Sequence, residues 1–98
     1  MNLYSTPEIL KAVARRASEL RIAKGLRQSD LAHAAGLSLS TIQRFEQTGE
    51  VAFDAVVRIA MALEAERDFL NLFPAPDMRS LDELLKPQRK RVRPRNQR

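Results

Sequence analysis

Residues 28–49, QSDLAHAAGLSLSTIQRFEQTG, constrain the fold of this chain more than any other stretch. Apolar residues recur at helical spacing in both halves, which predicts one helix over 28–35 and a second over 39–47. Gly36 between them can take the left-handed conformation that ends a helix, and the hydroxyl of Ser38 can cap the helix that follows. Two helices joined by a glycine-containing turn of this length predict a helix-turn-helix, whose second helix fits the major groove of DNA.

The same segment resembles the repressor-type helix-turn-helix family, the group of Cro, phage repressors and XRE-like bacterial regulators. The positions that match the family pattern are Gly25, Leu26, Gln28, Leu31, Ala32, Ala35, Gly36, Leu37, Ser38, Thr41, Ile42, Phe45 and Glu46. One position departs from the pattern, because Arg27 stands where the family has a serine or threonine that caps the helix over 28–35. We therefore expect a weaker cap there and an additional positive charge close to the DNA phosphates.

The resemblance also implies which side chains face DNA. Gln28 and Thr41 are expected to contact phosphates, whereas Glu46 is expected to pair with another group inside the fold. Arginine can pair with guanine, glutamine with adenine, and leucine can pack on the thymine methyl, so the second motif helix offers candidates for reading bases. The residues expected at the DNA interface are Arg27, Gln28, Ser38, Leu39, Ser40, Thr41, Gln43 and Arg44. For each of them singly, the alternative is an exposed residue that makes no contact with DNA.

Three further helices complete the expected domain. The run Thr6-Pro7-Glu8 offers a capping hydroxyl, a proline in the first turn and an acid facing the helix dipole, which predicts a helix over 6–24. A capping box between Ser5 and Glu8 is the alternative start of the same helix. Apolar spacing predicts a fourth helix over 51–63 and a fifth over 65–73.

The apolar stripes of these helices identify the expected core. Val13 falls on the stripe of the first helix and Phe53 on the broad apolar face of the fourth, so both are expected to be buried. Ala52 offers no capping side chain, and the fourth helix should begin loosely. The prediction is an all-α, five-helix repressor-type domain over 6–73, followed over 74–98 by a linker, a short helix and a basic tail.

Charge is distributed unevenly along the chain. The net charge is +5, but residues 86–98 hold seven basic side chains and no acidic one, so residues 1–85 carry a net charge of −2. Basic residues nevertheless precede the motif and acidic residues follow it, which predicts a positive surface on the side of the motif. Three interpretations of the tail remain open: an arm on DNA, a docking segment for an acidic partner protein, or a solvated end.

Other classes of function find little support in this sequence. The chain has no cysteine, and no apolar run approaches the length of a membrane span. His33 is the only histidine, and it falls on the outer side of its helix. Ser29, Asp30 and His33 crowd one short helix with no pocket implied, so an enzyme is not expected, nor is a cofactor or a metal site. A cytoplasmic protein without a membrane partner is expected.

These observations converge on a regulator of transcription. A single small helix-turn-helix domain without a ligand-binding module resembles autoregulating antitoxins, in particular HipB-like proteins. That resemblance implies a homodimer that represses transcription by binding an inverted-repeat operator in double-stranded DNA, and that also holds a HipA-like kinase toxin. The alternatives are a stand-alone phage-type or operon repressor, and a protein-interaction module that does not bind DNA.

Overall fold

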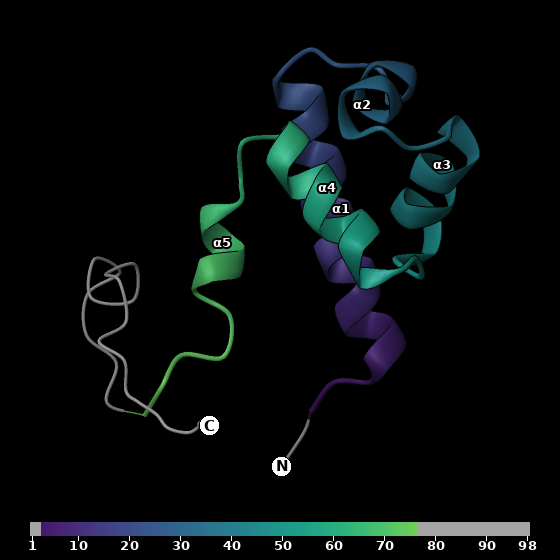
Figure 1. Ribbon diagram of the computed structural model, residues 1–98. Helices are drawn as coiled ribbons and strands as arrows, with labels where there is room; N and C mark the ends of the chain where they lie inside the picture. The colour runs from purple at the N-terminus through teal and green to yellow at the C-terminus, as the bar shows by residue number, and fades with distance from the viewer. Residues whose placement is uncertain (1–2, 77–98) are drawn as a thin grey trace, which may run out of the picture.

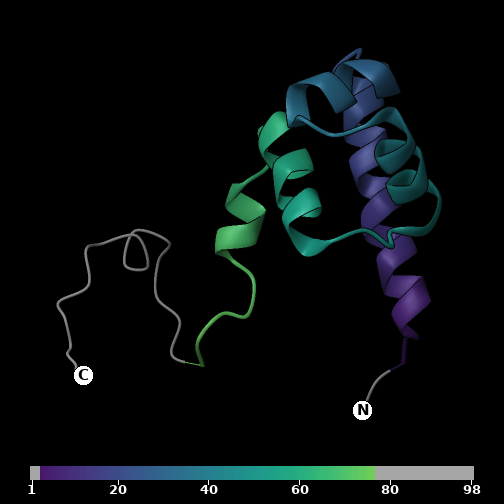
Figure 2. The ribbon, with the colours of Figure 1, turned by 45° about the vertical axis from the view of Figure 1, so that its right-hand side comes forward.

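The computed structural model describes residues 3–76, and this part of the chain is all-α. Its helices are α1 (Thr6–Ala23), α2 (Gln28–Ala35), α3 (Leu39–Thr48), α4 (Phe53–Ala62) and α5 (Arg67–Leu70). Figures 1 and 2 show α1 beside α4, with α3 and α5 on opposite sides of this pair. Helix α1 packs on α3, and α2 packs on both α3 and α4. None of the described helices combines the length and the apolarity needed to cross a lipid bilayer.

The start of α1 is set by a capping box. The backbone N–H of Glu8 donates to Oγ of Ser5 at 3.2 Å, and the N–H of Ser5 donates back to Oε1 of Glu8 at 2.9 Å. Two N–H groups that the helix leaves unpaired are thereby satisfied. The capping residue is therefore Ser5, as in the alternative start of this helix. Thr6 is not the cap but the first helical residue.

The two motif helices follow the sequence signals closely. Helix α2 has the expected bounds and ends at Gly36, which has a φ of 69°. The hydroxyl of Ser38 then accepts a hydrogen bond from the N–H of Thr41 at 3.1 Å and caps α3. Helix α3 runs one residue further than expected, because Gly49, rather than Thr48, takes the left-handed conformation that ends it.

The core of the domain lies where the first four helices meet. Its most deeply buried side chains are Ala14, Leu31, Ile42, Phe45 and Ile59, each at most 1% exposed. Every helix from α1 to α4 contributes at least one of them. The burial of these apolar side chains holds the helices of the motif in a fixed relative orientation.

Two expectations about the core and one about helix length are wrong. Phe53 is 64% exposed and Val13 is 43% exposed, because the described elements cover only part of the side of α4 and of α1 on which they lie. Helix α5 spans only four residues instead of 65–73, and none of its side chains is buried. Without a buried apolar face, so short a segment gains little from extending as a helix. Helix α4 begins at Phe53, two residues later than expected, and Ala52 before it contributes no side-chain cap.

The short helix and the basic tail expected after Pro76 lie outside the described residues.

Candidate nucleic-acid interface

Helix α3 is buried on one side and open on the other. Ile42 and Phe45 lie in the core, whereas Ser40, Gln43 and Arg44 are exposed on the opposite side. Leu39, at the first position of the helix, is 43% exposed. Because residues four apart share a helix face, Leu39 lies beside Gln43, and Ser40 lies beside Arg44. The structure therefore brings these four residues of the expected DNA interface, which are the candidates for reading bases, together on one outward surface.

A partly buried ion pair fixes α3 against α1. Nε and Nη2 of Arg21 donate to the two carboxylate oxygens of Glu46 at 2.7 and 3.1 Å, and Nη1 donates to the carbonyl oxygen of Leu26 at 2.7 Å. The two side chains are 11% and 8% exposed. A bidentate pair of this kind sets orientation as well as distance. The expectation that Glu46 pairs within the fold is confirmed.

The protonation state of Glu46 follows from the same contacts. Burial alone raises the pKa of this carboxyl group, because water no longer solvates its charge. Hydrogen bonds from Arg21 and Gln28, together with the positive charge of Arg21, outweigh burial, and the pKa of Glu46 lies below its ordinary value. Glu46 is therefore ionised at neutral pH, as the pairing requires.

Gln28 joins this network from α2. Its Nε2 donates to Oε1 of Glu46 at 2.9 Å, so the side chain links the start of α2 to the last turns of α3. The expected phosphate contact of Gln28 stays a prediction. The N–H groups in the first turn of α2 have no partner within the helix and suit a phosphate oxygen, which is consistent with that prediction.

Arg27 lies at the start of α2 with 82% of its side chain exposed. A guanidinium group cannot accept a hydrogen bond, so Arg27 does not cap the helix, as expected. Asp30 compensates in part: its carboxylate accepts from the backbone N–H of Arg27 at 2.8 Å and from the guanidinium at 3.2 and 3.3 Å. The side-chain hydrogen bond from Arg27 is the main cause that lowers the pKa of Asp30.

Three hydroxyl groups gather at the start of α3. Oγ of Ser38 lies 2.8 Å from Oγ1 of Thr41 and 3.1 Å from Oγ of Ser40. Ser38 and Ser40 are exposed, whereas Thr41 is half-buried. Hydroxyl groups at a helix N-terminus can donate to phosphate oxygens, so this cluster is chemically suited to the role expected of Thr41.

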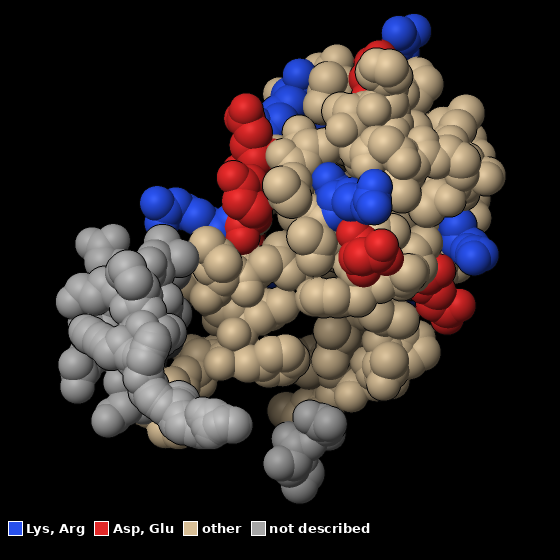
Figure 3. Space-filling model, in the orientation of Figure 1, with Lys and Arg blue, Asp and Glu red and all other residues tan. Residues whose placement is uncertain are grey.

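The surface around the motif carries mixed charge. Figure 3 shows basic side chains over α2, α3 and α4, and a row of acidic side chains along the connection from α4 to α5. The acidic residues of that connection are Glu64, Glu66 and Asp68. Acidic groups also lie close to the motif, at Glu50 and Asp54. On the face drawn in Figure 3, the positive charge therefore lies on individual basic side chains around the motif, with acidic groups between them.

The sequence did not single out Arg58, which the structure places beside the motif. It lies in α4, but it lines the same hollow as Thr41 and Arg44. No local pattern marks this residue, because it follows α3 in the chain and approaches it only through the packing of α4 on α2.

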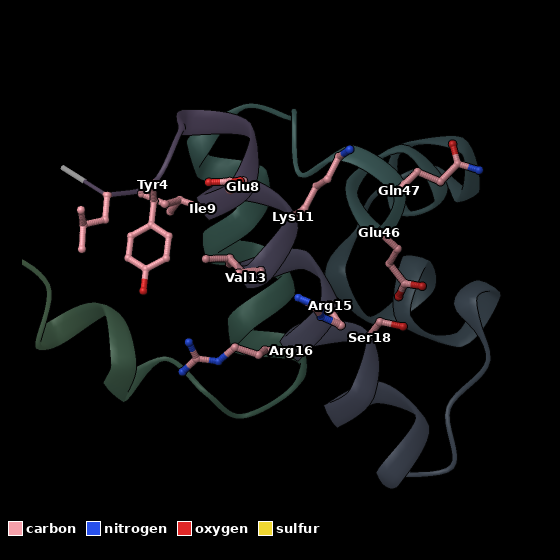
Figure 4. Close-up of a pocket in the computed structure, with 12 residues that line it drawn as sticks. Tyr4, Glu8, Ile9, Lys11, Val13, Arg15, Arg16, Ser18, Glu46 and Gln47 are labelled. Carbon is pink, nitrogen blue, oxygen red and sulfur yellow. The ribbon is translucent and has the colours of Figure 1, made fainter.

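A second hollow runs along the N-terminal half of α1. Figure 4 shows Tyr4, Ile9 and Val13 on one side of this hollow and Gln47 of α3 at its other end. Tyr4 and Ile9 are 68% and 49% exposed, so this side of the hollow presents apolar surface, whereas Lys11, Arg16 and other polar residues line the rest.

Fold and exposed surface together define a helix-turn-helix domain of the kind that places its second motif helix in DNA. The family model described as a helix-turn-helix domain matches residues 12–73, which is more than half of the chain. The chain therefore belongs to the helix-turn-helix domain family. No curated protein matches the chain.

Proposed function

We propose that this protein is a sequence-specific DNA-binding repressor of transcription. The observation that supports this most directly is the contrast between the two sides of α3. Arg21 and Gln28 hold Glu46 on the inner side, while Gln43 and Arg44 extend from the outer side with no side-chain hydrogen bond to the described residues. A rigidly held helix with free polar side chains is what base recognition requires.

The proposal includes an operator with two-fold symmetry. Two copies of α3 on one face of a duplex must follow the helical repeat, so the half-sites of an inverted repeat should lie about 10 base pairs apart or a multiple of that. Binding at such a site in a promoter excludes the transcription machinery, which is how we propose that the protein represses.

Selection of bound sequences from a pool of random duplexes tests the proposal, followed by footprinting on the selected site. We expect an inverted repeat, and we expect Arg44→Ala or Gln43→Ala to weaken binding to it by about 1–3 kcal/mol if the side chain reads a base. Arg67→Ala, in the exposed helix α5, is the matched control and should bind like the wild type. Uniform protection that is independent of sequence would contradict the proposal.

A homodimer is part of the same proposal. Phe53 stacks edge-on against Phe69 of α5, with ring centroids 5.9 Å apart; Phe53 is exposed and Phe69 is half-buried in one chain. Leu70, Leu72 and Phe73 extend this exposed apolar area, at 45%, 46% and 93% exposure. We define Phe53, Phe69, Leu70, Leu72 and Phe73 as the aromatic patch and propose that it pairs with its copy in a second chain.

The narrower proposal is an antitoxin. A small helix-turn-helix chain with a basic C-terminus resembles HipB-like antitoxins, so we propose that the protein represses its own operon and binds a HipA-like kinase toxin. Co-expression with the product of a neighbouring kinase gene, followed by affinity purification, tests this. Operator binding without a stable kinase complex would indicate that the protein is a stand-alone repressor. A partner complex without operator binding would indicate a protein-interaction module.

A further inference from the structure

Arg58 is positioned over the turn of the motif although it belongs to α4. Its Nη1 lies 3.8 Å from the point where a Cβ would stand on Gly36, the residue that ends α2. The guanidinium therefore lies against the backbone of the α2–α3 turn. Thr41 and Arg44 of α3 and Ala52 before α4 line the same open hollow.

The guanidinium of Arg58 is free to bind a ligand, unlike two other arginines near the motif. Arg21 is committed to Glu46, and Arg27 to Asp30, through hydrogen bonds of 2.7–3.3 Å. The contact of Arg58 with Asp54 is 4.0 Å from Nε to Oδ2, with side chains 56% and 77% exposed. This distance is too long for a hydrogen bond, and exposed pairs one helical turn apart contribute little to stability.

We propose that Arg58 contacts a phosphate of the DNA strand that borders the groove occupied by α3. The inference rests on the proposed DNA-binding function and adds a residue that the motif does not include. When a recognition helix lies in the major groove, phosphates of the flanking strands approach the elements on either side of it. The fork of donors on an arginine matches a phosphate group, and a contact of this kind positions the protein without reading sequence.

Asp54 modulates this contact in the proposed arrangement. Its carboxylate lies beside the guanidinium and would repel an approaching phosphate. Removing that negative charge with Asp54→Asn should therefore tighten binding to DNA. Removing the positive charge with Arg58→Gln should weaken it, and Arg58→Lys should retain most of the effect, because a phosphate contact depends mainly on charge.

The test compares the salt dependence of binding to the selected operator for the full-length wild type and for Arg58→Gln. Each lost phosphate contact should reduce the slope of log K against log salt by about 0.9, so a dimer that loses one contact in each half-site should lose about 1.8. The affinity advantage of the wild type should then shrink about tenfold between 50 and 200 mM salt. The loss should be similar on an unrelated duplex, and the selected sequence should not change. Arg67→Gln is the control, since it makes the same change of charge on α5, and unfolding midpoints should be unchanged in both variants.

Each outcome bears on the proposal. Equal changes of slope in Arg58→Gln and Arg67→Gln would overturn it, because the effect would then be that of net charge alone. A change in the selected sequence would also overturn it, since Arg58 would then read a base. If the wild type binds an operator but Arg58→Gln has the wild-type slope, the inference fails and the DNA-binding function stands. If the wild type shows no binding to DNA, both are wrong.

Discussion

Gly49 ends α3 with a φ of 76°, and a Cβ built there would lie 2.5 Å from the carbonyl oxygen of Leu10 in α1. Gly25 has a similar φ of 74° but nothing within 4 Å of a Cβ. A side chain at either position would strain the backbone, but only at Gly49 would it also overlap with other atoms. At Gly49 the missing side chain is what allows the end of α3 to approach the backbone of α1.

We predict that Gly49→Ala destabilises the domain more than Gly25→Ala. The left-handed conformation costs an alanine about 1–2 kcal/mol at either position. The overlap with Leu10 adds about 1–3 kcal/mol at Gly49 alone, as expected for overpacking. Urea unfolding of the two variants measures the difference, and equal free energies of unfolding would contradict the close approach.

Glu46 predicts how the stability of the domain depends on pH. Its pKa in the folded chain is below the value of about 4.3 that an unfolded chain would show. The ionised carboxylate therefore stabilises the fold fully at pH values above the pKa of the unfolded chain. This stabilisation is lost as the pH falls through the lowered pKa of the folded chain.

Glu46→Gln should remove this component of the pH dependence. At neutral pH the variant should be less stable by about 1–3 kcal/mol, because Arg21, which is 11% exposed, loses its charged partner. The difference in free energy of unfolding between wild type and variant should shrink as the pH is lowered from 5 toward 3. A difference that stays constant over this range would show that the carboxylate does not titrate as described.

The junction between α4 and α5 places a residue with a side chain in a backbone conformation that favours glycine. After the last turn of α4, Glu64 has a φ of 60°, a region that glycine adopts more readily than a side-chain-bearing residue. The N–H of Glu64 donates to the carbonyl oxygen of Met61, and that of Ala65 to Ala60, at 3.0 and 2.7 Å. This pair of bonds is a Schellman motif, in which this position is usually glycine.

Glu64→Gly should therefore stabilise the domain, by about 0.5–1 kcal/mol after allowing for the greater freedom of glycine in the unfolded chain. The contact that the carboxylate makes with Nζ of Lys24, at 3.5 Å, is exposed and contributes little. Glu64→Ala is the control, since it removes the carboxylate and keeps the strained φ. Thermal unfolding in which the glycine variant is no more stable than the alanine variant would contradict this explanation.

At the scale of the whole molecule, the apolar surface that a single chain leaves exposed predicts self-association. The aromatic patch belongs to α4 and to the segment around α5, where no side chain of the helix is buried. A domain of this size buries a limited core, and a second copy would cover the patch.

We predict that the double variant Phe69→Ser, Phe73→Ser is monomeric in analytical ultracentrifugation at micromolar concentration, whereas the wild type is a dimer. Operator affinity should fall, because each half-site is then bound separately. Ile9→Ser, in the hollow along α1, is a control that removes a different exposed apolar group. A wild-type chain that sediments as an 11.1 kDa monomer and binds its operator tightly would contradict the dimer.

The sequence by itself determined the elements whose signals lie within one or two turns. Apolar spacing, Gly36 and the hydroxyl of Ser38 defined α2 and α3, because a cap and a helix stop act on neighbouring backbone groups. The same reasoning identified the side chains on the outer face of α3, since helical periodicity alone separates them from Ile42 and Phe45. Whether these side chains contact DNA stays a prediction.

Only the tertiary structure decided what lies against these helices. Phe53 and Val13 fit apolar stripes but are exposed, because burial depends on whether another element covers that side. The ion pair between Arg21 and Glu46 joins residues 25 positions apart, and only the resemblance indicated that Glu46 pairs at all. Arg58 reaches the α2–α3 turn through the packing of α4 on α2. Local patterns carry no information on such contacts, since they depend on how whole helices pack in three dimensions.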